Sequence, residues 1–176
     1  ILPVFHVLLN RFIIHVPNSG ETFKTIQSIE RWLEQGIYID GKYVKVPAIL
    51  VQVQLDHLND TTELRVYTDF LIDHALTVKN TGIIFDSSDL KSQFDYEMEI
   101  KRFLQTAIEN DLFEVWYQPI YSVEEKRYVS LEALSRLKHP EFGWVSPELF
   151  IQIAVKNGLE TKITQLQLAK ICRFIK

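Results

Sequence analysis

The sequence predicts a mixed α and β chain made of two units, and three observations support this. Segments with the period-2 alternation of strands and segments with the apolar spacing of helices follow one another along the chain. Hydrophobic residues make up 47% of the 176 residues, which is enough for a sizeable core in one or two domains. The polar segment Asp86-Ser87-Ser88-Asp89 interrupts this pattern and marks the expected boundary.

The first unit is expected to run strand, helix, hairpin, strand, helix, strand. Asn10-Arg11 can turn one strand into the next, and Asp40-Gly41 is a hairpin signal between short β-prone runs. Tyr67, Leu71 and Ala75 lie on one stripe of the second helix. In chain order, the expected elements are strands within 4–16, a helix over 21–35, a hairpin over 37–43, a strand over 44–55, a helix over 63–79 and a strand over 83–85.

The second unit is expected to centre on a hairpin. Alternation from Phe113 predicts a strand, Glu124-Glu125-Lys126 a solvated turn, and 128–134 the returning strand. Ser146 and Pro147 have the residue types of a helix N-cap and first helical position. The remaining expected elements are a helix over 93–110, a loop over 139–145, a helix over 148–157 closed by Gly158, and a helix from a Thr161 cap to Lys176.

Composition excludes several classes of protein. The net charge of −4 and the lack of a basic block argue against non-specific binding of a nucleic-acid polymer. A single cysteine, Cys172, excludes a disulfide framework within the chain and suits a reducing compartment. No apolar run approaches the roughly 18–20 residues of a membrane span, and the apolar start of the chain lacks the basic region and cleavage site of a signal peptide.

Three groups of residues are predicted to be structural or to lie on the surface. The five histidines, His6, His15, His57, His74 and His139, have no metal-ligand spacing among themselves. Cys172 lies on an apolar helical face, which predicts a buried hydrophobic side chain. The aromatic residues are spread at strand and helix spacings, so they predict core packing and not a platform for stacking bases.

Glu132 is the residue most in need of an explanation. It falls between Leu131 and Ala133 near the end of the returning strand, and a carboxylate buried there without a partner is costly. One interpretation is a ligand to a divalent cation, which prefers oxygen donors. The other is a structural ion pair with Arg136, which lies four residues on and on the same face of a continuing strand.

The segment around this glutamate resembles the opening of an EAL domain. The resemblance rests on Tyr117-Gln118-Pro119-Ile120 and on the Glu-Ala-Leu-x-Arg pattern of 132–136, and it continues through later positions at matching spacing. These are His139-Pro140, Gly143, Pro147, Phe150-Ile151, Ala154 and Gly158-Leu159. Val155 and Glu160 depart from the family pattern, which usually has a glutamate and an apolar residue there.

The resemblance implies a fold, an activity and a set of site residues. EAL domains are modified TIM barrels that hydrolyse cyclic di-GMP to linear pGpG with Mg²⁺ or Mn²⁺. By this similarity, Glu132 is expected to bind the metal and Arg136 a phosphate oxygen, while Gln118 and Leu134 are expected to line the ligand site. The matching segment corresponds to about the first quarter of a barrel of typical size, so an incomplete α/β barrel is expected.

The first unit resembles, more weakly, the second half of a GGDEF domain, the fold of cyclic di-GMP synthases. The signature falls on 8–12, Leu-Leu-Asn-Arg-Phe, where only Phe12 is retained, and Ile72-Asp73-His74-Ala75-Leu76 resembles a later helix, followed by Lys79 and Gly82. Leucines would obstruct the approach of backbone to nucleotide, and Arg11 places a cation where a metal ligand belongs. No cyclase activity is therefore expected.

The expected organisation is an α+β unit, 1–88, the C-terminal half of a degenerate GGDEF-like domain, then a connecting helix, 89–112, and the N-terminal part of an EAL domain, 113–176. The chain is expected to be a fragment of a longer cytoplasmic protein with an upstream sensory domain, and not catalytic alone, because the remaining metal ligands would lie beyond it. An incomplete barrel leaves unpaired strand edges and exposed apolar surface, so a homo-oligomer or domain swap is expected. A non-catalytic cyclic di-GMP receptor and a purely structural interaction module are the alternatives.

Overall fold

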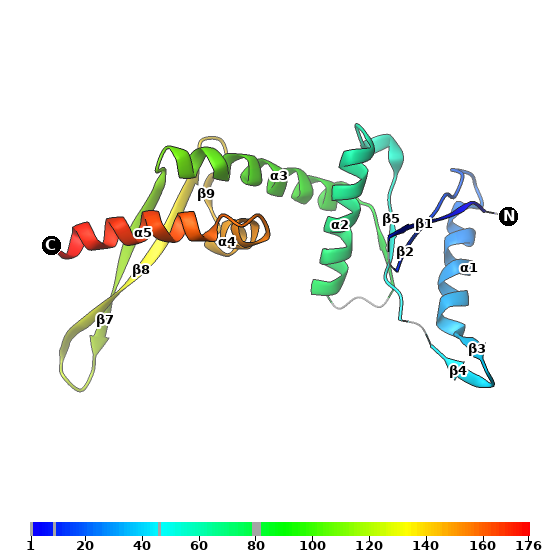
Figure 1. Ribbon diagram of the computed structural model, residues 1–176, viewed down its shortest axis with the longest axis horizontal. Helices are drawn as coiled ribbons and strands as arrows, with labels where there is room; N and C mark the ends of the chain where they lie inside the picture. The colour runs from blue at the N-terminus through cyan, green and yellow to red at the C-terminus, as the bar shows by residue number, and fades with distance from the viewer. Residues whose placement is uncertain (1, 9, 46, 79–81) are drawn as a thin grey trace. The chain divides into compact units, whose positions relative to one another are not determined.

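The computed structural model describes residues 2–8, 10–45, 47–78 and 82–176 of the protein (Figure 1). Contacts within the chain divide it into two compact units, Ile1–Ser88 and Asp89–Lys176. Among the described residues, no helix combines the length and the apolar character that a membrane span requires.

In the residues that the structure describes, the first unit has three separate two-stranded sheets and two main helices. β1 pairs with β2 and β3 with β4, both antiparallel, whereas β5 and β6 are parallel. The order of strands and helices agrees with the order expected from the sequence. The elements are β1 Val4–Leu8, β2 Arg11–Ile14, α1 Thr22–Gln35, β3 Ile37–Ile39, β4 Lys42–Val44, β5 Leu50–Gln52, the 3-10 turn η1 Leu55–His57, α2 Thr61–Thr77 and β6 Ile83–Phe85.

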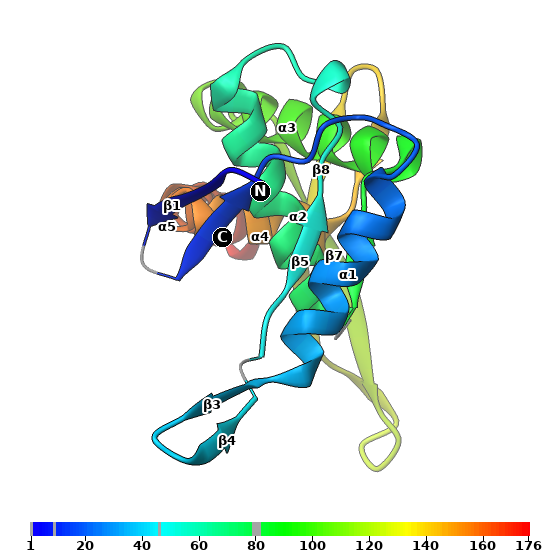
Figure 2. The same cartoon turned by 90° about the vertical axis from the view of Figure 1, so that its right-hand side faces the viewer.

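The β3–β4 hairpin forms at the predicted Asp40-Gly41 turn (Figure 2). Asp40 has a φ of 49° and Gly41 a φ of 74°, so two successive residues adopt the left-handed conformation that a tight two-residue turn requires. Tyr38 and Tyr43 lie opposite each other in the register, and their rings meet edge to face with centroids 5.6 Å apart. The hairpin prediction is confirmed.

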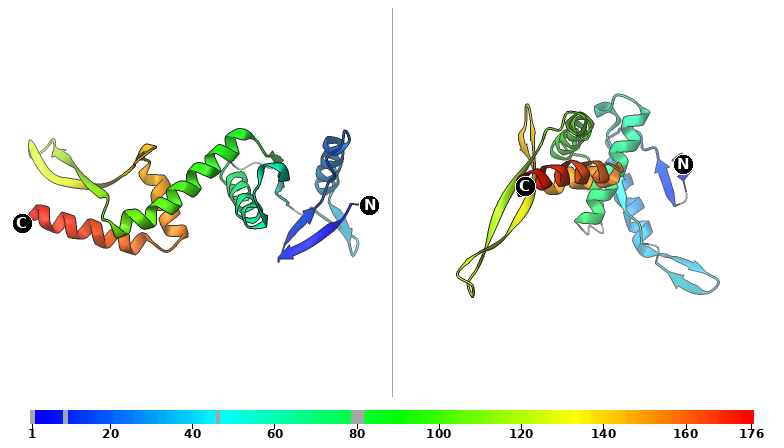
Figure 3. Two further views of the ribbon diagram at one scale, coloured as in Figure 1. Left: turned by 90° about the horizontal axis from the view of Figure 1, so that it is seen from above. Right: turned by 60° about the vertical axis from the view of Figure 1, so that its left-hand side comes forward.

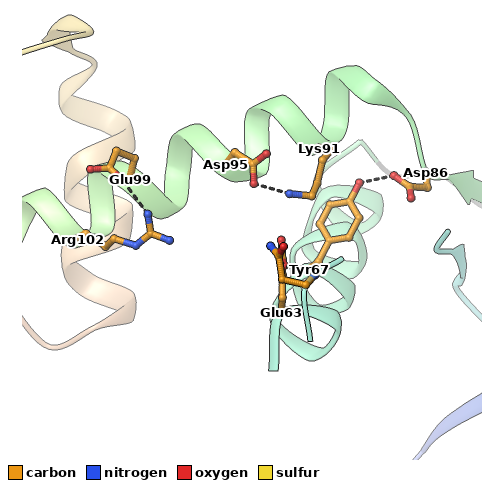
Figure 4. Close-up of polar contacts among 8 residues, drawn as sticks. Glu63, Tyr67, Asp86, Lys91, Asp95, Glu99 and Arg102 are labelled. Atoms are coloured by element: carbon orange, nitrogen blue, oxygen red, sulfur yellow. Dashed lines mark hydrogen bonds and ion pairs between the residues drawn. The ribbon is translucent and has the colours of Figure 1, made fainter. Parts of the chain in front are cut away.

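Helix α2 supplies most of the buried apolar surface described in the first unit. The Asp60 side chain caps its N-terminus by accepting hydrogen bonds from the backbone of Thr62 and Glu63. The predicted stripe is buried, because Tyr67, Leu71 and Ala75 are at most 1% exposed. The Tyr67 hydroxyl donates to the Asp86 carboxylate at 2.5 Å, so both polar groups have a partner in this core (Figure 4).

Two predictions from the sequence are wrong, one for the strand over 44–55 and one for the start of the helix after the polar segment. The strand expected over 44–55 is reduced to β5, three residues long, and is followed by the η1 turn. Pro47 lies inside the expected range and cannot donate to a strand ladder. The helix expected from Gln93 begins at Ser88, because serine and aspartate in the polar segment suit the start of a helix as well as a linker.

The second unit packs helices against a three-stranded antiparallel sheet of order β7-β8-β9 (Figure 1). Phe113, Leu137 and Phe150 lie in one buried cluster, with the rings of Phe113 and Phe150 5.7 Å apart. The elements, beginning with the helix that crosses the boundary between the units, are α3 Ser88–Glu109, β7 Phe113–Ser122, β8 Arg127–His139, β9 Gly143–Val145, α4 Pro147–Lys156 and α5 Glu160–Ile175.

The predicted hairpin of this unit is confirmed, but its strands are longer than expected. The Glu124-Glu125-Lys126 turn joins β7 to β8, with Lys126 at a φ of 52°. Strand β8 continues to His139, so the expected loop over 139–145 is wrong: Gly143, Trp144 and Val145 form β9 and pair with β8. A strand of three residues is too short to show alternation in the sequence.

Helices α4 and α5 cover one face of the hairpin. Ser146 and Pro147 occupy the predicted N-cap and first position of α4, and Phe150 is fully buried. The cap of α5 is Leu159 and not the expected Thr161. Two views show α5 running beside the hairpin, and the ring of Phe174 stacks on Tyr117 with centroids 4.0 Å apart (Figures 1 and 3).

Intrahelical ion pairs line the exposed side of α3. Lys91 pairs with Asp95 at 2.6 Å and Arg102 with Glu99 at 2.7 Å, as Figure 4 shows. These pairs are spaced four and three residues apart, the spacing at which side chains meet on a helix surface. The opposite side of the helix carries the buried residues Ile100, Leu104 and Ala107.

Candidate functional site

The register of β7 and β8 brings the predicted site residues onto one face of the sheet. Gln118 lies directly opposite Glu132, and Trp116 lies opposite Leu134. Arg136 lies two residues further along β8. Because side chains alternate along a strand, Glu132, Leu134 and Arg136 point to the same side, and so do Trp116 and Gln118. We call this side the Glu132 face.

The other face of the hairpin carries the core and is therefore not available to a ligand. Phe113 and Leu137, which lie opposite each other in the register, are 1% and 0% exposed. Tyr117 stacks on Phe174 of α5 on the same side. The sheet thus separates a packed face, against the helices, from the Glu132 face.

The Glu132 side chain is exposed and, in the described part of the chain, takes part in no ion pair or side-chain hydrogen bond. The structural ion pair with Arg136, considered from the sequence, is not formed. An exposed carboxylate keeps its hydration and does not need a protein partner. Both of its oxygens are therefore accessible to a cation from solution.

Arg136 is half-buried and is held by a carbonyl and an aromatic ring. Its Nη1 donates to the carbonyl oxygen of Ser135 at 2.8 Å, and its guanidinium carbon lies 5.2 Å from the ring centroid of Trp116. This distance is within the range of a cation–π contact. A guanidinium has five N–H donors, so donors remain for an anion on this face.

Two tryptophans on the Glu132 face were not anticipated. Trp116 and Trp144 are each 47% exposed, and their rings meet edge to face with centroids 5.3 Å apart. The Trp116 indole N–H donates to the Glu114 carboxylate at 2.9 Å, and the Lys138 ammonium lies 5.7 Å from the Trp144 ring centroid. The prediction that the aromatic residues serve core packing is wrong for these two.

The position of one of these tryptophans could have been predicted from the sequence. Trp116 is two residues before Gln118 on the same strand, so alternation alone places it beside the predicted site. Trp144 could not be placed in this way, because its strand, β9, was taken for a loop. Its position opposite Lys138 follows only from the observed pairing of β8 with β9.

The described residues do not form a complete metal site. Within the described ranges, no group of three or more histidine, cysteine or acidic side chains could hold a metal ion. On the Glu132 face, the Glu132 carboxylate and the Gln118 amide lie directly opposite each other, and both have oxygen donors. Mg²⁺ needs six oxygen ligands, several of which can be water or substrate phosphate, so these two groups fit a part of such a site only.

A hollow of about 550 Å³ lies elsewhere, between the hairpin and α5. Its wall includes Tyr117, Leu131 and Ala133 from the strands and Ile171 and Phe174 from the helix. It carries none of the four predicted site residues. The hollow is open to solvent and its lining is mostly apolar. It forms where α5 covers the long hairpin incompletely.

The predictions for histidine and cysteine had mixed outcomes. His139 is buried, accepts backbone hydrogen bonds from Glu141 and Phe142 through Nδ1, and stacks on the Phe142 ring, so its structural role is confirmed. Cys172 is exposed, and the prediction of a buried side chain is wrong. The side chain of His57 lies outside the described residues.

In the first unit, the segment that resembles a GGDEF signature spans the end of β1 and the start of β2. Arg11 forms an ion pair with Asp69 of α2. The described part of this segment therefore has a paired cation at Arg11, where the resemblance to a GGDEF signature implies a metal-binding acid. Leu9, and Lys79 of the later resemblance, lie outside the described residues.

Comparison with known proteins supports the resemblance of the second unit to an EAL domain. The sequence model of the EAL domain family matches residues 101–176. The chain is 25% identical over 148 residues to the cyclic di-GMP phosphodiesterase NbdA of Pseudomonas aeruginosa, covering 84% of this chain and 19% of that protein. It is 28% identical over 111 residues to MucR, named a bifunctional diguanylate cyclase and cyclic di-GMP phosphodiesterase, of the same organism, covering 63% and 16%.

A shorter match to the probable cyclic di-GMP phosphodiesterase PdeB of Escherichia coli reaches 43% identity over 63 residues, covering 36% of this chain and 12% of that protein. This chain thus spans about a fifth or less of the length of each of these three relatives.

Two solved structures are similar to the chain. A Vibrio cholerae LapD structure with S helix, GGDEF and EAL parts, bound to c-di-GMP, covers 99% of this chain and 41% of its own, with a TM-score of 0.48 at 16% identity. The EAL enzyme Bd1971, in a cGMP-bound form, has a TM-score of 0.31 at 26% identity and covers 57% of this chain and 23% of its own. The match to residues 101–176 shows that the segment with Gln118, Glu132, Leu134 and Arg136 has the sequence pattern of an EAL domain.

Proposed function

We propose that this chain is part of a cyclic di-GMP phosphodiesterase of the EAL type. The observation that carries the proposal is the shared orientation of Gln118, Glu132 and Arg136 on the face of the sheet that the helices do not cover. The register of β7 and β8, in which Gln118 lies opposite Glu132, supports a common role for these residues. The names of NbdA, MucR and PdeB give the substrate class.

In this proposal each of the four residues has a distinct role. Glu132 supplies one carboxylate ligand to a divalent cation, which in the complete site would polarise a phosphodiester and activate a water molecule. Arg136 donates hydrogen bonds to a phosphate oxygen, and its guanidinium geometry suits that contact. Gln118 hydrogen-bonds the ligand beside the metal, and Leu134 packs against it.

The site is completed by groups that the described residues do not provide. One exposed carboxylate cannot hold Mg²⁺ or Mn²⁺ tightly, so we propose that the other ligands come from further strands of the same barrel in a longer protein. The corresponding division of the chain is a GGDEF-like part, 1–88, a connecting helix, 89–112, and the beginning of an EAL domain, 113–176. Alone, the chain is expected to be inactive.

We further propose that the GGDEF-like part has no cyclase activity. The support comes from Arg11, whose guanidinium pairs with Asp69 and brings positive charge to the position of a metal ligand. An arginine has no oxygen ligand to offer the Mg²⁺ that accompanies a nucleoside triphosphate. The part would then serve regulation or docking, and incubation with GTP and Mg²⁺ should yield no cyclic di-GMP.

Large apolar side chains remain exposed on the hairpin, which supports the expectation of self-association. Val123, Tyr128 and Leu131 are 82%, 67% and 49% exposed. β7 is an edge strand in the described sheet, and edges and apolar patches of this kind tend to be covered by another chain or domain. A cytoplasmic location, with any sensory domain upstream, belongs to the same proposal.

The test is hydrolysis of cyclic di-GMP by the full-length product of the gene that encodes this chain, in Mg²⁺ or Mn²⁺. The wild-type protein is expected to form pGpG, and the Glu132→Gln variant is expected to lose at least 100-fold in rate, since removing a metal ligand typically has effects of that order. Tight binding without hydrolysis would favour the alternative of a non-catalytic receptor, and the absence of both would overturn the proposal.

A further inference from the structure

The Glu132 face carries an alternating arrangement of cations and aromatic rings. The Arg136 guanidinium lies over Trp116, Trp116 meets Trp144 edge to face, and the Lys138 ammonium lies over Trp144. The two rings come from β7 and β9, on either side of β8, which contributes both cations. We call these four residues the tryptophan–cation cluster.

The two rings of this cluster remain accessible although they touch each other. Trp116 and Trp144 are each 47% exposed, whereas the aromatic residues Phe113 and Phe150 on the opposite side of the same sheet are at most 1% exposed. Indole rings have a large apolar area, and leaving two of them half in water loses hydrophobic stabilisation. A planar anionic ligand can stack on the exposed rings, and the two cations beside them attract its charge.

The polar contacts fix the orientation of Trp116. Its indole N–H donates to Glu114, which lies opposite Arg136 in the register. The ring is therefore held between a carboxylate at its edge and a guanidinium over its face. A ring that is fixed before a ligand arrives loses less conformational entropy on binding than a free one.

We propose that the tryptophan–cation cluster recognises the guanine base of the cyclic dinucleotide, with Trp116 as a specificity-determining residue. A purine is planar and similar in size to an indole, and bases stack on aromatic side chains. Arg136 and Lys138 bring positive charge to this side of the sheet, which favours a ligand that carries phosphodiester anions. This inference rests on the proposed function, because it takes its ligand from it.

The position of the cluster relative to the predicted metal ligand agrees with this role. Trp116 is two residues from Gln118 on β7, and Gln118 lies opposite Glu132. Two residues along a strand correspond to about 7 Å, which is close to the distance between a base and its phosphate. One bound nucleotide could therefore place its phosphate towards Glu132 and its base on Trp116.

The experiment uses the indole N–H signals of the three tryptophans in the ¹⁵N-labelled chain, with Trp32 of the first unit as an internal reference. Cyclic di-GMP is added without metal. The signals of Trp116 and Trp144 are expected to shift saturably, with a dissociation constant on the order of 1 mM, which corresponds to one stacked base together with the attraction of the two cations. The Trp32 signal is expected to stay in place, and ribose 5-phosphate, which lacks a base, is expected to give no shift.

Variants separate base stacking from general effects on folding. Trp116→Leu is expected to weaken binding at least about tenfold, as the loss of one stacking contact does, with Trp144 as the remaining reporter. Trp116→Phe keeps a ring and is expected to retain most of the affinity, and an unchanged amide spectrum elsewhere shows that each variant is folded. The inference is overturned if cyclic di-GMP gives no saturable shift, if ribose 5-phosphate acts equally, or if Trp116→Leu binds as the wild type does.

The Glu132→Gln variant distinguishes this inference from the proposed function. It is expected to keep the metal-free shifts of Trp116 and Trp144, with an affinity at least as high as that of the wild type, because stacking does not use that carboxylate and its removal takes away a negative charge near the phosphate. Saturable shifts together with hydrolysis that does not depend on Glu132 would contradict only the proposed metal role. Glu132-dependent hydrolysis by the full-length protein without any shift of the tryptophan signals would contradict only the stacking site.

Discussion

Gln118 and Glu132 lie directly opposite each other on β7 and β8, on the face of the sheet that the helices leave uncovered. Neither residue contributes to the buried core of the second unit. This arrangement separates the residues that fold the hairpin from those that we propose to bind ligand. It predicts that the two sets respond differently to substitution.

The first prediction concerns Glu132. Glu132→Gln in this chain is expected to change the free energy of unfolding by no more than about 0.5 kcal/mol, because the side chain is exposed and has no ion pair in the described part of the structure. Urea denaturation measures this value. A loss of about 3 kcal/mol or more, typical of a broken buried pair, would show that the carboxylate has a structural role.

The second prediction concerns the opposite face. Phe113→Ala is expected to destabilise the second unit by about 3–5 kcal/mol, because it removes a fully packed ring in contact with Phe150. Phe5→Ala is the control, since Phe5 is 56% exposed. Urea denaturation followed through the indole signals of Trp116 and Trp144 reports the second unit. Equal effects of the two substitutions on that unit would contradict the assignment of its core.

A third prediction follows from the cap of α2. Asp60→Ala is expected to lower the stability of the first unit by about 0.5–2 kcal/mol, because the backbone N–H groups of Thr62 and Glu63 lose their acceptor. Asp60→Asn retains an acceptor oxygen and is expected to preserve most of the stability. Thermal unfolding monitored by circular dichroism distinguishes the two variants, and an equal loss for both would indicate a role of the charge and not of the cap.

The fourth prediction concerns the β3–β4 turn. Gly41→Ala is expected to weaken the hairpin by about 1 kcal/mol, because the left-handed φ of 74° is strained for a residue with a Cβ although nothing lies within 4 Å of that atom. Gly20→Ala is the matched control, since its Cβ also meets open space and its φ is not positive. The intensity of nuclear Overhauser contacts between Tyr38 and Tyr43 measures hairpin population, and an equal effect of both substitutions would refute the turn assignment.

The fifth prediction concerns self-association. Sedimentation of the chain is expected to show concentration-dependent dimers, and Val123→Lys together with Leu131→Lys is expected to reduce them, because both residues are exposed apolar side chains of the hairpin. Phe5→Lys, an exposed apolar residue of β1, is the control. A chain that remains monomeric at millimolar concentration would contradict the proposal of a homo-oligomer.

The sequence predicted those elements that are long enough to show a period. The stripe of α2 was visible because Tyr67, Leu71 and Ala75 are spaced at four-residue intervals, and all three are buried. β9 was missed because three residues cannot show alternation, and with it the place of Trp144. The range 44–55 looked like one strand because its apolar residues alternate, whereas Pro47 limits the ladder that can form.

The site was predicted in part for a similar reason. Gln118, Glu132, Leu134 and Arg136 came from a family motif, and alternation along β7 and β8 gives their common face. Exposure cannot be read from residue type, so Trp116 was assigned to the core and Cys172 to a buried helical face. Both expectations depended on which surfaces other elements cover, which is a property of the tertiary structure.

The central claim, that Glu132 binds a divalent metal beside a cyclic dinucleotide, is tested most directly by Mn²⁺-dependent hydrolysis of cyclic di-GMP by the full-length protein and its Glu132→Gln variant. The account predicts pGpG formation by the wild type and a loss of at least about 100-fold in the variant, with unchanged stability. Hydrolysis by the variant at the wild-type rate would contradict the account.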